Sequence, residues 1–100
     1  MKLLHPDMRV SYCLRAFRAG IRDTKEAGRL ARAGRCEEAQ NLYARVDFLL
    51  RKPKDVFDTV IKEHERLPED MFPLIHDYCD LLDIQKHMKD VIRIYCELGL

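Results

Sequence analysis

Near the C-terminal end of the chain, His76, Asp80, Asp83 and His87 are the side chains best suited to hold a metal ion. They recur at spacings of three and four residues, which places some of them on one helical face. Imidazole and carboxylate are ligand types for zinc and iron. However, no histidine of the sequence follows the Glu-x-x-His pattern of carboxylate-bridged bundles. Asp83 is also expected to cap a helix and turn His87 away. We therefore interpret the cluster as a solvated acidic face and assign no metal and no other cofactor.

The sequence offers little for nucleophilic catalysis. Cys79 and His76 lie three residues apart, and a thiol beside an imidazole can be activated. No acid that would orient the histidine is evident, so we expect Cys79 to be a packed thiol. The single serine, Ser11, lacks a glycine-flanked elbow, and no GxxxxGK[ST], GxGxxG or HExxH motif is present. The sequence therefore predicts a protein that is not an enzyme and has no catalytic residues.

Arginine dominates the charge pattern of the N-terminal half. Residues 1–54 carry 13 Lys/Arg against 6 Asp/Glu, whereas residues 55–100 carry 5 against 11, and the net charge is +1. Guanidinium groups bind carboxylates and phosphates, so an acidic protein, RNA or an anionic lipid could each use this surface. Only Tyr12 and Phe17 could stack on bases, which favours a protein partner. The predicted partner-binding face consists of Arg9, Arg15, Arg18, Arg22, Arg29, Arg32 and Arg35.

The four cysteines are Cys13, Cys36, Cys79 and Cys96. They form no CxxC pair, and the gaps of 22 and 16 residues within the first and last pairs do not suit a zinc finger. Each lies among apolar helical positions, so we expect four buried, reduced thiols. Reduced thiols indicate the cytosol, the nucleus or the mitochondrial matrix. The basic N-terminal segment could target the matrix, but we expect a retained structural helix.

Composition and periodicity predict an all-α protein. Ser11, Thr24, Thr59 and Asn41 are the only Ser, Thr and Asn residues, too few for a loop-rich fold. One hundred residues suffice for a single domain, spanning 1–100, and no apolar run reaches the ~20 residues of a transmembrane helix. We expect five to six antiparallel helices in a short right-handed solenoid or bundle.

Turn residues and apolar stripes set the expected helix boundaries. Asp7 begins the first helix, Gly34 ends the second in a left-handed conformation, and Pro53 separates the third from the fourth. Asp23 and Glu26 have the spacing of a capping pair, which predicts a new helix near Thr24. The later segments cover residues 24–34, 35–52, 54–67, 71–82 and 84–98.

Residues 30–46 resemble a tetratricopeptide or pentatricopeptide helical hairpin. The resemblance lies in the small Ala27, Gly34 at the turn, Ala39 early in the next helix and Tyr43 four residues later. It covers about one repeat, because Pro73 falls where a second copy should continue as helix. A hairpin of this kind implies a protein-binding or RNA-binding surface, although a single repeat would not read an RNA sequence.

A fainter resemblance, to cytochrome c oxidase subunit Va, covers the C-terminal two-thirds. It rests on Arg-Lys-Pro-Lys-Asp-Val-Phe at 51–57, Leu-Pro-Glu at 67–69, Ile75 with Cys79, and Asp-Val-Ile-Arg-Ile at 90–94. That family implies a non-catalytic helical subunit on the matrix side of a respiratory-chain complex. We therefore expect a structural subunit of a larger multiprotein assembly, with an RNA-contacting component of a ribosomal or RNA-processing complex as the alternative.

Overall fold

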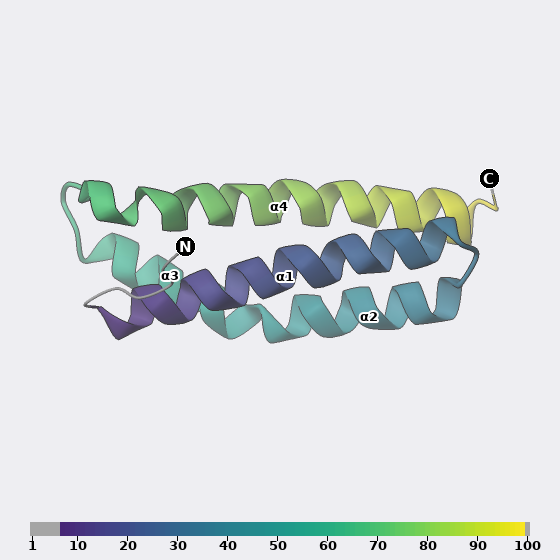
Figure 1. The fold of residues 1–100 in the computed structure, drawn as a ribbon, viewed down its shortest axis with the longest axis horizontal. Coiled ribbons are helices and arrows are strands. Elements are labelled where there is room, and N and C mark those ends of the chain that lie inside the picture. Colours follow the sequence, from purple (N-terminus) through teal and green to yellow (C-terminus); the bar gives the residue numbers. More distant parts are fainter. Residues whose placement is uncertain (1–6, 100) are drawn as a thin grey trace.

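The computed structural model describes residues 7–99, which form an all-α bundle without strands (Figure 1). Helix α1 spans Met8–Arg32, α2 Cys36–Leu49, α3 Arg51–Lys62 and α4 Phe72–Ile92. A 3-10 turn, η1 (Glu69–Met71), precedes α4, and a π-helical segment, η2 (Arg93–Glu97), extends it. Helices α2 and α3 follow one another across Leu50 and run antiparallel to α1, whereas α4 runs parallel to α1. The all-α class is confirmed.

The expected number of five to six helices is wrong, because two predicted boundaries do not exist. Helix α1 continues through Asp23, whose carboxylate accepts a hydrogen bond from Arg22 Nε at 3.0 Å and does not cap a new helix. Thr24 and Gly28 are fully buried within this continuous helix. Helix α4 likewise continues through Asp83, which is exposed. In both places packing between helices outweighs a weak local stop signal.

The turn between α1 and α2 is the one that the sequence predicts at Gly34. Gly34 has φ +81°, and its N–H donates to the Ala31 carbonyl at 3.0 Å. The N–H of Arg35 donates to the Leu30 carbonyl at 2.9 Å, which completes a Schellman motif. At the other end of α1, the Asp7 carboxylate accepts from the Arg9 N–H at 2.9 Å. The predicted helix start at Asp7 and the predicted helix end at Gly34 are both confirmed. Pro6, which precedes the start, lies outside the described residues.

Leu50 separates α2 from α3, and Pro53, the expected boundary, lies in the first turn of α3. The Leu50 N–H closes the last turn of α2 on the Val46 carbonyl, and Lys54 N–H donates to the Leu50 carbonyl, both at 3.0 Å. Pro53 has no N–H to continue the ladder between these two bonds, so the helix is interrupted one turn earlier than expected. Its carbonyl accepts a hydrogen bond from the buried Cys13 Sγ at 3.5 Å, which ties the junction to α1.

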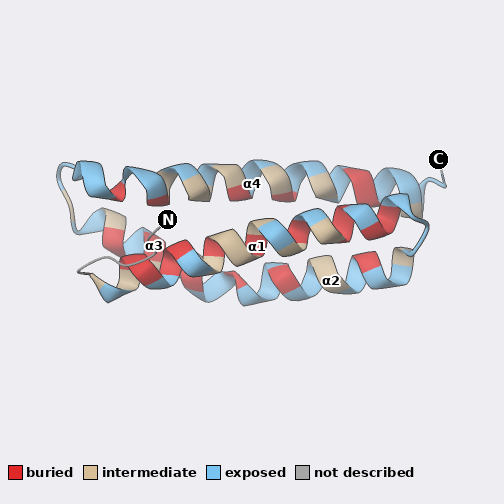
Figure 2. Ribbon diagram, viewed as in Figure 1, coloured by how far each residue is buried: buried red, intermediate tan, exposed pale blue. Residues whose placement is uncertain are grey.

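An aromatic cluster fills the core at the N-terminal end of α1. The rings of Phe57 and Tyr78 are stacked, with centroids 4.2 Å apart, and Phe17 lies 5.7 and 5.3 Å from them. Because the three residues come from α3, α4 and α1, the cluster joins three helices. Figure 2 shows buried residues along the length of α1, with much of α2 and α4 exposed. The apolar residues Val10, Leu14 and Phe17 of α1 lie in this core, and the partly buried Ile21 packs against it.

Small side chains bring α1 close to its neighbours farther along. A Cβ at Gly20 would lie 3.0 Å from the Leu50 methyl carbons, and the Met88 side chain fills the space beside Gly28. Thr24, midway between the two glycines, is fully buried, and its hydroxyl has no hydrogen-bond partner within residues 7–99. The second core cluster, beyond this contact, comprises Ala27, Leu30, Ala31, Ala39, Val91 and Ile92.

Gln85 is a buried polar residue where α2, α3 and α4 meet. Its side-chain oxygen accepts from Lys54 Nζ at 2.8 Å, and its amide nitrogen lies 3.4 Å from the Asp47 carboxylate. Its backbone carbonyl accepts from the Tyr43 hydroxyl at 3.1 Å. Burial raises the pKa of that hydroxyl, with a smaller contribution from Asp47. These bonds fix α4 against the α2–α3 arm.

Candidate functional site

Most arginines of the predicted basic face are already ion-paired within the fold. Arg9 binds Glu63 and Asp7, at 2.7 and 2.9 Å, and Arg18 binds Asp77 at 2.8 Å. Three further pairs are local: Arg22–Asp23, Arg29–Glu26 and Arg35–Glu38. Of the seven arginines, only Arg15 and Arg32 lack such a partner within residues 7–99. Two of these pairs, Arg9–Glu63 and Arg18–Asp77, bring acids of residues 55–100 to the N-terminal half, and the others use acids of that half itself.

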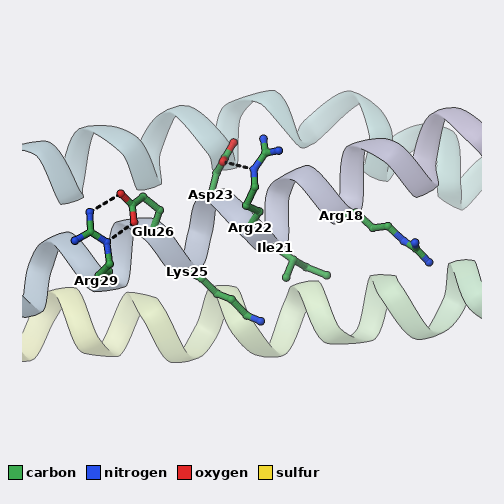
Figure 3. A pocket seen from close by; sticks show the side chains of 7 residues that line it. All are labelled: Arg18, Ile21, Arg22, Asp23, Lys25, Glu26 and Arg29. Atoms are coloured by element: carbon green, nitrogen blue, oxygen red, sulfur yellow. Dashed lines mark hydrogen bonds and ion pairs between the residues drawn. The ribbon is translucent and has the colours of Figure 1, made fainter. Parts of the chain in front are cut away.

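The structure brings three of these arginines together in a shallow depression on the outer side of α1 (Figure 3). Lys25, which the sequence analysis did not include, lies among them; its spacing of three and four residues from Arg22 and Arg29 was the available signal. The other predicted arginines lie elsewhere along α1 or in the turn that follows. The lining residues are Arg18, Ile21, Arg22, Asp23, Lys25, Glu26 and Arg29.

Bound arginines lower the pKa of two acids, one in this depression and one paired with Arg9 near the start of α1. Hydrogen bonding from Arg29 holds the pKa of Glu26 below its usual value, and Arg9 does the same for Glu63. The depression contains four cations, Arg18, Arg22, Lys25 and Arg29, and two acids, Asp23 and Glu26. A third acid, Asp77, forms an ion pair with Arg18. Such a nearly balanced surface is poorly suited to concentrate phosphate groups.

The candidate metal-binding residues are only partly brought together. His76 Nδ1 lies 3.4 Å from an Asp80 oxygen, and Asp77 is near enough to complete a three-ligand group. However, Asp77 already binds Arg18, and His76 is largely exposed. Asp83 and His87 do not belong to this group and lie exposed farther along α4. The structure thus brings together His76 and Asp80 of the predicted set, adds Asp77, and leaves Asp83 and His87 apart.

The expectation of four buried, reduced thiols is wrong. Cys36 and Cys96 form a disulfide, with Cα atoms 5.4 Å apart across a sequence separation of 60 residues. The bond joins the first residue of α2 to η2 and closes the end of the bundle at which α1 turns into α2 (Figure 1). Sequence spacing could not identify this pair, because four cysteines allow three connectivities.

The two free cysteines have opposite surroundings. Cys13 is fully buried against Pro53, and burial raises the pKa of its thiol to about 11. Cys79 is exposed on α4 and not packed as expected, because the buried face of α4 runs through Leu74 and Leu81. Within residues 7–99, His76 Nδ1 contacts Asp80, and neither free thiol forms a hydrogen bond with a histidine.

Large apolar side chains are exposed where α2 ends. Phe48 is 64% and Leu49 60% exposed, although the sequence pattern placed Leu49 in the core. On α1, Met8 is 74% exposed and Tyr12 41%. None of the helices within residues 7–99 has the length and apolarity needed to cross a lipid bilayer.

Met8, Tyr12 and Leu49 line a groove between α1 and the α2–α3 junction, the α1–α2 groove, and Phe48 lies next to Leu49 outside this lining. Two adjoining depressions share Ala16. One is lined by Met8, Tyr12, Arg15 and Ala16, and the other by Ala16, Ala19, Gly20, Asp23, Val46, Leu49 and Leu50. This groove could not be predicted from the sequence. Ala16 and Ala19 are typical of any helix, and they indicate a binding site only when the residues across the groove are known.

Comparisons with known proteins do not assign a family. The chain matches no protein-family model, no curated protein and no solved structure. The tetratricopeptide-like hairpin and the subunit Va resemblance therefore stay predictions based on the residues that suggested them. The function is argued below from the surface of the bundle.

Proposed function

We propose that this chain is a non-catalytic structural and interaction subunit of a larger multiprotein assembly. The observation that carries the proposal is the exposure of Phe48 and Leu49 beside the α1–α2 groove. Exposing two neighbouring large apolar side chains is unfavourable in water, by roughly 1.5–3 kcal/mol for each side chain that could be buried. Contiguous apolar surface of this kind marks protein-binding sites.

Helix α4 and the segment that follows it add further apolar surface away from the groove. Leu82 on α4 is 41% exposed, and Tyr95 in η2 and Leu98 after it are 42% and 55% exposed. Other side chains of α4 are buried and hold the bundle together, so the exposed apolar side chains do not contribute to the core. Two apolar surfaces on different helices suit a subunit that contacts more than one neighbour.

We also propose a compartment that permits disulfides, in place of the reducing compartment expected from the sequence. The Cys36–Cys96 pair supports this part of the proposal, since disulfides persist mainly in oxidising environments. The mitochondrial matrix side was expected partly because reduced thiols were expected. Membership of a mitochondrial respiratory-chain complex rests on the sequence resemblance alone and stays a prediction.

The RNA-contacting alternative has less support from the structure. Nonspecific RNA binding depends on cations that are free to neutralise phosphates. Of the seven arginines assigned to that role, Arg9, Arg18, Arg22, Arg29 and Arg35 are bound to acids of the same chain. Anionic lipid would require the same free cations. A protein partner uses the apolar surface as well as the charge.

Affinity purification of the tagged chain from its own source, followed by mass spectrometry, tests the proposal. We expect a fixed set of proteins at constant stoichiometry after nuclease treatment and a high-salt wash. A Leu49→Glu variant should lose part of this set, whereas Ala33→Glu, at an exposed position at the end of α1 far from the groove, should keep it. Recovery of the chain without other proteins would contradict the proposal. Recovery of RNA would also contradict it if removing the RNA with nuclease released every co-purified protein.

A further inference from the structure

The α1–α2 groove is long, narrow and apolar along its floor. It extends along α1 from Met8 to Gly20, about 20 Å at 1.5 Å per helical residue. Ala16 and Ala19 line it from α1, and Val46 and Leu50 from the other arm. Small residues between two helices leave space into which the side chains of a third helix can pack. A helix of about four turns laid along α1 would therefore contact both arms beside Ala16, Ala19 and Gly20 and would contact α1 alone beside Met8 and Tyr12.

Cations without an acid partner flank this floor. Arg15 lines the groove, and Arg45 lies one helical turn before Leu49 on the same side of α2. Lys52 follows Leu49 by three residues, and the Arg51 guanidinium lies over the Phe48 ring, 5.3 Å from its centroid. Within residues 7–99 none of these four forms an ion pair, in contrast to most arginines elsewhere on α1.

The only acid lining the groove is Asp23, and Arg22 binds it. The charge that a bound segment meets is thus positive on both sides: Arg15 on α1 and Arg45 with Lys52 on the other arm. An apolar floor between two basic sides is complementary to an amphipathic helix with an apolar stripe flanked by carboxylates.

We infer that the α1–α2 groove binds an acidic amphipathic helix of a partner protein. The apolar stripe of that helix packs on Ala16, Ala19 and Leu49, and its flanking glutamates or aspartates pair with Arg15 and Arg45. A second copy of this chain is disfavoured, because a symmetric contact would bring the same arginines of both copies together. The inference rests on the proposed function and specifies the chemistry of one partner.

Selection of displayed peptides on the full-length chain tests the inference. Each peptide has about 14 residues, enough for about 20 Å of helix, with leucine at the i, i+3, i+4 and i+7 positions. The remaining positions vary among Glu, Lys, Gln and Ala. We expect strong enrichment of Glu over Lys at the positions that flank the leucine stripe.

The Arg15→Glu/Arg45→Glu double variant is the decisive comparison. Peptides selected on the natural chain should bind it about tenfold more weakly, and a new selection should enrich Lys. The control is Arg32→Glu/Arg66→Glu, which changes the net charge equally at exposed positions away from the groove. Its affinity should stay within about twofold of the natural chain. Circular dichroism of both variants verifies that they are folded.

Three results would overturn the inference: failure to select any peptide, selection without Glu enrichment, or equal loss of affinity in both double variants. Self-association through the groove, detected by sedimentation and abolished by Leu49→Glu, would assign it to a second copy. If the tagged chain still co-purifies with a defined assembly in any of these cases, the proposed function stands and only this partner assignment fails.

Discussion

Cys36, the first residue of α2, is covalently joined to Cys96 in η2, so the start of one arm is tied to the end of another. A sequence separation of 60 residues makes this bond effective against unfolding. On the chain-entropy account, a loop of that length is worth about 4 kcal/mol. We expect the Cys36→Ser/Cys96→Ser double variant to lose about this free energy of unfolding in urea denaturation. Cys79→Ser, the control, should lose almost none, and a double variant as stable as the natural chain would refute the role of the bond.

Thiol counting checks the cysteine environments independently. An aromatic disulfide reagent at neutral pH should titrate one thiol, Cys79, in the native protein. Denaturation without reductant should add a second, Cys13, which burial protects and whose raised pKa disfavours the reactive thiolate. Denaturation with reductant should give all four cysteines. Four reactive thiols before reduction would show that Cys36 and Cys96 are not bonded.

Thr24 offers a substitution expected to stabilise the fold. Its hydroxyl is buried, without a hydrogen-bond partner in the described part of the chain, and valine has nearly the same shape. Removing an unsatisfied buried polar group recovers its desolvation cost, so Thr24→Val should raise the free energy of unfolding by about 1 kcal/mol. Thr59→Val is the comparison, because the exposed Thr59 hydroxyl donates to the Asp55 carbonyl and should give no gain. Destabilisation by Thr24→Val would indicate a bond that the hydroxyl makes in solution.

The Arg9–Glu63 pair makes stability depend on pH in the acid range. Hydrogen bonding from Arg9 lowers the pKa of Glu63 in the folded protein, so folding favours the charged carboxylate. This stabilisation is fully present above the unfolded-state pKa of about 4.3 and is lost as the pH falls through the lower folded-state pKa. Thermal unfolding of the natural chain should therefore lose more stability below about pH 5 than that of Glu63→Gln. Glu65→Gln, which removes a carboxylate two residues away, should follow the natural chain.

Local turn chemistry made part of the fold predictable. Gly34 supplies the positive φ of the α1–α2 turn, Asp7 caps α1, and Pro53 interrupts the arm near Leu50. Each of these residues acts through its own backbone or through neighbours within a few residues. The same kind of local reasoning failed at Asp23 and Asp83, where burial of α1 and α4 along their length keeps both helices continuous.

The surface was less predictable than the turns, because it depends on which side chains another helix covers. Leu49 and Leu50 are adjacent and equally apolar, but only Leu50 packs against Gly20; Leu49 is left at the rim of the groove. The arginines could be found from the sequence, but not the acids that bind them, since Glu63 and Asp77 are 54 and 59 residues from their partners. The disulfide is non-local in the same way.

Hydroxyl-radical footprinting in the native source tests most directly whether a partner covers the exposed apolar surface. Oxidation of Met8, Tyr12 and Phe48 would be measured in a gently prepared extract and in the purified chain alone. We predict that these side chains are oxidised several-fold less in the extract, and that Leu49→Glu removes the protection. Equal oxidation in the two preparations would show that the groove is open to water in the source, which would contradict its role as a binding surface.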